Sequence, residues 1–139
     1  MKTQELNKLY HCIYRLDYHL VIVTKYRRSC LTEEMRVRAR EIFESTLNKW
    51  GCELLEANGE PDHMHLLISA PPTVALSKLV NNLKTVSSRL LRKEFARHLA
   101  RVYRKPVLWH RAYFIVTRGG APLSVMRQYI ENQNKDSDC

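Results

Sequence analysis

The chain has 139 residues, and this length predicts a single domain over residues 1–139 with one hydrophobic core. Hydrophobic residues make up 45% of the chain, with four glycines and five prolines, so the composition excludes a disordered protein. Lysine and arginine together number 23 against 14 acidic residues, giving a net charge of +9. A domain this basic favours a polyanionic partner, most often nucleic acid, over a protein that merely has a basic surface.

The sequence shows no sign of a membrane anchor or a metal-binding cysteine cluster. No apolar run approaches the roughly 18 residues of a membrane helix, and the first residues lack the apolar stretch of a signal peptide. We therefore expect a cytoplasmic protein without membrane association. The cysteines are far apart and form no C-x-x-C pair, so we interpret them as buried or incidental thiols and not as zinc ligands. They are Cys12, Cys30, Cys52 and Cys139.

The first half of the chain predicts a strand, a helix and a pair of strands. Residues 10–25 are rich in β-branched and aromatic residues and predict a long strand that is buried on both faces toward its end. Thr32, followed by two glutamates, predicts the start of a helix that ends at Gly51. Residues 52–58 and 63–70 predict two strands joined by a turn.

The second half predicts a helix, a strand and a short final helix. Residues 73–101 combine a buried apolar stripe with a mostly solvated basic surface, which is typical of a long helix on a core. A strand at 112–117 precedes a flexible joint at Gly119 and Gly120, and a helix is expected at 122–134. The first six elements follow the split βαβ order, so we expect an α+β fold with a ferredoxin-like antiparallel sheet.

Two pairs of residues carry the candidate chemistry. His63 and His65 project to the same side of an extended strand, and Tyr129 and Gln133 share one face of a helix. Two imidazoles and an amide oxygen can hold a divalent metal with positions left open for phosphate oxygens. A phenol beside that metal is a candidate nucleophile, although its ordinary pKa of about 10 requires a nearby positive field.

Each pair also has a purely structural interpretation. Two histidines on one strand are often ordinary strand residues, and Tyr129 is also compatible with a packing aromatic on an amphipathic helix. No residue stands out in the sequence as a general base. The pattern alone leaves these alternatives open.

Four segments together resemble the single-tyrosine HUH transposases of the bacterial and archaeal insertion-sequence 200/605 group. They are residues 61–67 (PDHMHLL), 83–89 (LKTVSSR), 108–109 with 113–114 (LW and YF), and 128–133 (QYIENQ). The similarity runs in order along nearly the whole chain. The histidine pair alone is shared with replication initiators and conjugative relaxases. A single tyrosine with glutamine four residues later, in so small a chain, is more restrictive.

The resemblance implies a set of roles for these residues. His63, His65 and Gln133 would ligate a divalent metal, Mg²⁺ or Mn²⁺, and Tyr129 would be the covalent nucleophile. The implied activity is a DNA transposase that cleaves and rejoins single-stranded DNA at insertion-sequence ends through a 5′-phosphotyrosine intermediate. The expected substrate carries hairpins at the element ends. A homodimer is also expected, in which the tyrosine of one subunit completes the metal site of the other.

The candidate DNA contacts are less specific than the catalytic set. Trp109 could stack on unpaired bases or pack in the core, with equal weight. His110 and Arg111 stand where relatives often carry Ser-Pro, so the sequence departs from the resemblance in this loop. The full set of candidate contacts is Lys84, Arg89, Arg92, Trp109 and Arg111.

Two other functions fit parts of the pattern. One is a non-catalytic module that binds single-stranded nucleic acid on a ferredoxin-like sheet, as RNA-recognition domains do. The other is a tyrosine transposase that serves the host and acts on repeated palindromes. The combined histidine, tyrosine and glutamine set favours the transposase over the non-catalytic module.

Overall fold

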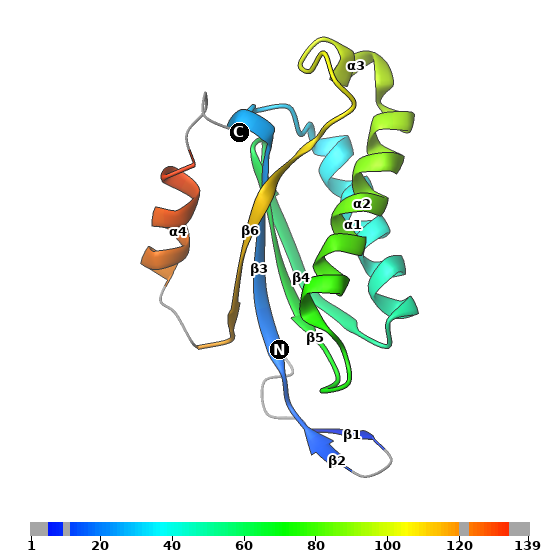
Figure 1. Ribbon diagram of the computed structural model, residues 1–139, viewed down its shortest axis with the longest axis vertical. Helices are drawn as coiled ribbons and strands as arrows, with labels where there is room; N and C mark the ends of the chain where they lie inside the picture. The colour runs from blue at the N-terminus through cyan, green and yellow to red at the C-terminus, as the bar shows by residue number, and fades with distance from the viewer. Residues whose placement is uncertain (1–5, 10–11, 120–122, 134–139) are drawn as a thin grey trace.

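A four-stranded antiparallel sheet forms the centre of the described part of the chain (Figure 1). The computed structural model describes residues 6–9, 12–119 and 123–133. The strand order is β4-β5-β3-β6, which is the order of a ferredoxin-like sheet and confirms the predicted fold class. The strands are β3 (Asp17–Thr24), β4 (Glu53–Glu60), β5 (His63–Ser69) and β6 (Trp109–Thr117).

Helices α1 (Glu33–Lys49) and α2 (Leu76–Glu94) cover one face of this sheet (Figure 1). Thr32 begins α1 as expected, because its hydroxyl accepts a hydrogen bond from the Met35 backbone N–H at 3.2 Å. Alternate residues of β3 and β5 point toward these helices and form the main core. The buried strand residues of this core include Leu20, Ile22, Met64, Leu66 and Ile68.

Helix α4 (Leu123–Glu131) lies on the opposite face of the sheet (Figure 1). Val21 and Val23 of β3 are fully buried there, against Phe114 of β6 and two residues of α4, Tyr129 and Ile130. The predicted burial of both faces of this strand is therefore confirmed. The sheet has a thick core under α1 and α2 and a thin one under α4.

The predicted single strand at 10–25 is wrong in its first part. Residues Asn7–Leu9 (β1) and Cys12–Tyr14 (β2) pair with each other in a separate antiparallel hairpin, and residues 10 and 11 lie outside the described part. The central strand begins only at Asp17. Pairing between β1 and β2 satisfies their backbone groups locally, so this segment does not extend the main sheet.

The predicted helix at 73–101 is also divided. It breaks at Phe95, whose backbone leaves the helical region (φ −119°, ψ 37°), and continues as α3 (Ala96–Ala100). The Phe95 ring packs against the main core, which a uniform helical period does not reveal. Strand β6 starts at Trp109, earlier than predicted. No helix in the described residues has the length and apolar character needed to cross a membrane.

Candidate active site

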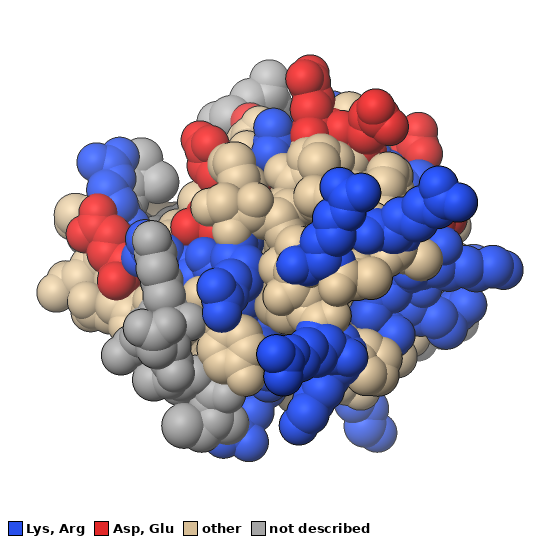
Figure 2. Space-filling model, turned by 90° about the horizontal axis from the view of Figure 1, so that it is seen from above, with Lys and Arg blue, Asp and Glu red and all other residues tan. Residues whose placement is uncertain are grey.

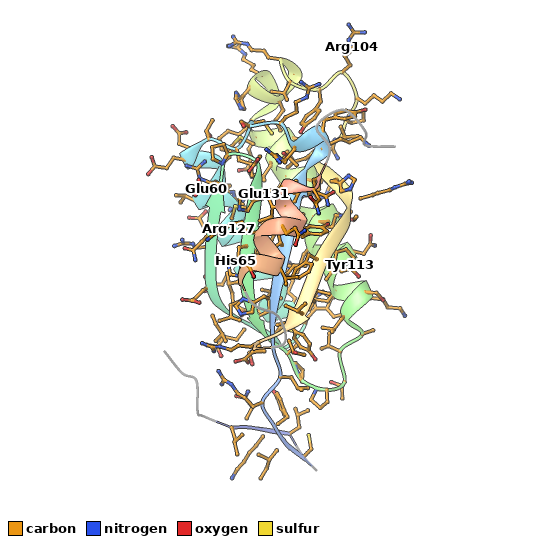
Figure 3. All side chains as sticks on the ribbon, turned by 90° about the vertical axis from the view of Figure 1, so that its left-hand side faces the viewer. Glu60, His65, Arg104, Tyr113, Arg127 and Glu131 are labelled. Carbon is orange, nitrogen blue, oxygen red and sulfur yellow. The ribbon has the colours of Figure 1, made fainter. Side chains whose placement is uncertain are left out.

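His63 and His65 lie on the face of β5 that is turned toward α4. His65 is opposite Asn58 of β4 and Val21 of β3, so the two histidines belong to the thin side of the sheet. Both line a cavity of about 560 Å³, together with residues of α4 and of the turn between β4 and β5. Figure 3 shows His65 on the same side of α4 as Glu60, Arg127 and Glu131.

The imidazole of His63 is held by its neighbour in the sequence. Its Nδ1 lies 2.8 Å from Oδ1 of Asp62, which suits an N–H that donates to the carboxylate. Metal-binding histidines commonly use one ring nitrogen in this way, because the hydrogen bond orients the ring and leaves the other nitrogen for the metal. The side chains of His63 and Asp62 are only 17% and 20% exposed.

His65 has a partner that the sequence did not suggest. Its Nε2 lies 2.8 Å from Nδ1 of His19 on β3, and the two rings are stacked with centroids 5.0 Å apart. Burial lowers the pKa of both imidazoles; Arg118 lowers that of His19 further, and His19 that of His65. A lowered pKa keeps the rings neutral, which is the form that binds metals. The sequence held one clue to this contact. His19 and Val21 are two residues apart on one strand, so their side chains lie on the same face.

Tyr129 faces the thin core and does not line the cavity. Its ring packs against Phe114, with centroids 5.1 Å apart and planes at 36°. The hydroxyl is buried without a hydrogen-bond partner among the described residues, and burial raises the pKa of this phenol. The cavity side of α4 instead carries Arg127, Ile130 and Glu131. Successive helical residues are about 100° apart, so this helix orientation turns Tyr129 away from the cavity.

Gln133 lies just beyond α4 and also does not line the cavity. Its Nε2 donates to the backbone carbonyl of Tyr129 at 3.3 Å. Among the described residues, no group of three or more His, Cys, Asp or Glu side chains lies close enough together to hold a metal ion. The donor set nevertheless fits a divalent metal chemically, because the imidazoles of His63 and His65 line one cavity and the amide of Gln133 offers an oxygen. The predicted residues thus lie on one side of the sheet as two separated pairs.

The candidate DNA contacts have different environments. Trp109 is only 7% exposed and its Nε1 donates to Oγ of Ser87 at 2.9 Å, which agrees with the packing interpretation. Nζ of Lys84 donates to the backbone carbonyl of Arg111 at 2.7 Å. Arg92 donates from Nε to Oγ of Ser88 at 3.0 Å. The two remaining side chains, Arg89 and Arg111, are exposed.

Apart from these candidate contacts, a basic region lies at the end of the molecule near α3. Figure 2 shows lysine and arginine side chains spread over much of this end, with acidic side chains gathered mainly toward one edge. Four basic residues line a cavity of about 370 Å³ with the ring of Tyr26. They are Lys25, Arg28, Arg104 and Lys105. Such a surface suits the phosphate backbone of a nucleic acid.

Comparison with known proteins identifies the family. The model of the family described as "Transposase IS200 like" matches residues 12–133. The ISDra2 transposase TnpA of Deinococcus radiodurans is 30% identical over 130 residues, which cover 94% of this chain and 92% of that protein. The transposase for insertion sequence element IS200 of Salmonella typhimurium is 31% identical over 125 residues, which cover 90% of this chain and 81% of that protein.

Solved structures agree with this assignment. A crystal structure assigned as a transposase of Deinococcus radiodurans has a TM-score of 0.84 and 32% identity, covering 92% of this chain and 98% of that chain. The structure of a REP-associated tyrosine transposase bound to a REP hairpin has a TM-score of 0.56 and 13% identity, covering 91% and 70%, and supports the fold alone. The chain therefore belongs to the IS200-like transposase family, whose members are DNA-cleaving and strand-transferring enzymes.

Proposed function

We propose that this protein cleaves and rejoins single-stranded DNA at insertion-sequence ends, using a divalent metal and a 5′-phosphotyrosine intermediate at Tyr129. The observation that carries the proposal is the shared cavity: His63 and His65 both line it, and the helix that bears Tyr129 forms its other wall. Family membership supports DNA as the substrate. The REP-associated relative was solved with a hairpin, which supports hairpin-bearing DNA as the form to test.

The proposed reaction is a transesterification in which the phosphotyrosine conserves the bond energy. The Tyr129 hydroxyl loses its proton and its oxygen bonds to the scissile phosphorus, while the bond from phosphorus to the 3′ oxygen breaks. That oxygen takes up a proton and leaves as a free 3′-hydroxyl. Mg²⁺ or Mn²⁺ held by His63, His65 and Gln133 would stabilise the negative charge on the phosphate oxygens. Strand joining reverses these steps and needs no ATP.

The docked helix requires a rearrangement before this reaction. Tyr129 faces Phe114 in the thin core, so α4 must rotate or be exchanged with a second copy of the chain to present the phenol to the histidines. Gly119 precedes the helix with φ +82°, a left-handed conformation that glycine adopts without strain. We propose a homodimer in which α4 of one subunit completes the cavity of the other.

The test uses the full chain with single-stranded, hairpin-bearing element-end DNA and Mg²⁺ or Mn²⁺. On a denaturing gel the wild-type protein should form a covalent adduct, whereas Tyr129→Phe should bind the DNA and form none. Tyr113→Phe is the matched control, because Tyr113 packs on the opposite face of the sheet and should leave the adduct intact. An adduct that persists in Tyr129→Phe would contradict the assignment.

One observation favours the non-catalytic alternative. The Tyr129 hydroxyl is buried away from the cavity, as it would be in a packing aromatic. A wild-type protein that binds hairpin-bearing DNA tightly without metal, and cleaves it with neither metal, would support a binding module instead.

A further inference from the structure

Arg27 occupies a strained corner at the end of the central strand. It is the last residue of the short 3-10 turn η1 (Lys25–Arg27), and both Tyr26 and Arg27 have left-handed backbones, with φ of 59° and 52°. Residues other than glycine adopt this conformation at a cost in free energy. Such strain persists only where the surrounding contacts fix it, and it often marks a functional position.

One side of the Arg27 guanidinium contacts the C-terminal end of α4. Its Nη1 donates to the backbone carbonyls of Ile130 and Glu131 at 3.4 and 3.3 Å. The last carbonyls of a helix have no partner within the helix and carry partial negative charge, so a cation there stabilises the helix end. Arg27 is thus a contact that fixes α4 against the sheet, at the opposite end of the helix from Gly119.

The other side of the guanidinium contacts Asp62. Nε of Arg27 lies 3.2 Å from Oδ2 of Asp62 as an ion pair without hydrogen-bond geometry, so this Nε has no hydrogen-bond partner among the described residues. Oδ1 of the same carboxylate lies 2.8 Å from Nδ1 of His63. The side chains of Arg27 and Asp62 are only 23% and 20% exposed, so this ion pair is less screened than a surface pair. All three side chains line the cavity that contains the two histidines.

We propose that Arg27 is a positioning residue that connects the two separated halves of the site. It holds the end of the tyrosine-bearing helix and, through Asp62, fixes the ring of the candidate ligand His63. The placement of α4 and the readiness of His63 to bind metal then depend on the same guanidinium. The role of the metal in this inference rests on the proposed function. The contacts of Arg27 with α4 and Asp62 do not depend on whether the protein cleaves DNA.

The matched pair for the test is Arg27→Gln and Arg28→Gln. Both remove one positive charge at neighbouring positions, but Arg28 is exposed and contacts the ring of Tyr26, away from α4 and Asp62. Hydrogen exchange of residues 123–133 in the DNA-free protein should become about two- to fivefold faster in Arg27→Gln, because the helix end loses its cation. Arg28→Gln should exchange as the wild-type protein does.

Binding of Mn²⁺ alone gives the second readout. Removing the direct partner of His63 in Asp62→Ala should weaken Mn²⁺ binding by about 10- to 100-fold, as loss of such a hydrogen-bond partner does in other metal sites. Arg27→Gln should weaken Mn²⁺ binding by at least about threefold, but by less than the Asp62 variant does, since Asp62 stays in place without its cation. Arg27→Lys keeps the charge but loses the planar fork, so its values should lie between wild type and Arg27→Gln.

Two results would overturn the positioning role. One is equal exchange of residues 123–133 in Arg27→Gln and Arg28→Gln. The other is Mn²⁺ affinity that is the same in Arg27→Gln and the wild-type protein. Circular dichroism checks that each variant is folded. If both readouts respond as expected while no DNA adduct forms, the positioning role stands and the proposed cleavage function fails.

Discussion

At the residue scale, the position of the candidate nucleophile Tyr129 lowers the stability of the fold. The Tyr129 hydroxyl is buried without a partner in the described part of the chain, and an unsatisfied buried polar group costs free energy. Functional residues commonly violate the rules that stabilise a fold, because selection acts on the reaction. Leaving the docked position would therefore relieve the cost of the unsatisfied hydroxyl, against the loss of the ring packing on Phe114.

This placement predicts that Tyr129→Phe raises the free energy of unfolding by about 1 kcal/mol, since the variant keeps the ring and removes the unsatisfied hydroxyl. Urea denaturation of the metal-free, DNA-free protein measures it. Tyr103→Phe provides the contrast, because the Tyr103 hydroxyl donates to the Lys25 carbonyl at 2.7 Å. Its removal should lower the free energy of unfolding by about 1 kcal/mol. A Tyr129→Phe variant as destabilised as Tyr103→Phe would show that the hydroxyl has a partner.

The pH dependence of stability should show the same burial. Because burial raises the pKa of Tyr129 in the folded state, the folded protein holds this proton more tightly than the unfolded chain. The contribution of Tyr129 to the free energy of unfolding is fully present below the pKa of the unfolded chain, near 10, and is lost as pH rises beyond that value. Tyr129→Phe should therefore lose less stability than the wild-type protein above pH 10, and parallel losses would contradict the raised pKa.

Some residue-level features were predictable from the sequence and others were not. The alternation of side chains along a strand places His63 and His65 on one face whatever the rest of the chain does. The contact of His65 with His19 depends on the register between β3 and β5, and the contacts of Arg27 depend on a left-handed corner. Neither register nor corner leaves a local pattern in the sequence.

At the element scale, α2 and β6 are connected by a buried hydrogen bond. Oγ of Ser87 accepts from Nε1 of Trp109 at 2.9 Å and itself donates to the backbone carbonyl of Leu83 at 2.6 Å. Ser87 is fully buried in the middle of the apolar stripe of α2. A serine there fills a specific role, because it satisfies the indole N–H that Trp109 brings into the core.

Replacing Ser87 by alanine should lower the free energy of unfolding by about 1–3 kcal/mol, because the indole N–H of Trp109 loses its acceptor in a buried place. Thermal or urea unfolding measures the change. The matched control is Ser77→Ala on the exposed side of the same helix, which should stay within about 0.5 kcal/mol of wild type. Equal stability of the two variants would mean that Trp109 finds another acceptor or reaches solvent.

The element boundaries show where sequence patterns reach their limit. Helix α1 carries a helical period and a cap, β3 a β-branched apolar run and β5 an alternating pattern, so their existence and type followed from the sequence. The hairpin of β1 and β2 and the break at Phe95 arise from tertiary pairing and packing. The orientation of α4 about its own axis also follows from packing against Phe114, so the docked position of Tyr129 was not predictable.

At the scale of the whole molecule, the candidate site is divided between the sheet and a helix that follows Gly119. A thick core under α1 and α2 fixes the sheet, and the histidines lie on its other face, where α4 packs on a thin core of a few side chains. Such an arrangement favours movement or exchange of α4 over rearrangement of the sheet. The net charge of +9 adds attraction for DNA without deciding where the strand lies.

Mixing two inactive variants tests the proposed exchange between subunits. Tyr129→Phe and His63→Ala should each lack cleavage alone. Mixed in equal amounts and allowed to exchange subunits, they should recover about a quarter of wild-type cleavage, because half of the dimers would be mixed and each would have one intact site. Single-strand cleavage on a denaturing gel gives the readout. Absence of recovery, with mixed dimers shown by tagged subunits, would place each complete site within one chain.

The central proposal is that Tyr129 becomes joined to DNA although its hydroxyl is buried in the DNA-free protein. Mass spectrometry of the wild-type protein after reaction with hairpin-bearing single-stranded DNA and Mn²⁺, followed by nuclease and protease digestion, identifies the joined residue. We expect the nucleotide on the peptide that contains Tyr129, attached through a 5′-phosphate. A nucleotide on any other residue, or cleaved DNA without a protein-bound nucleotide, would contradict the proposal.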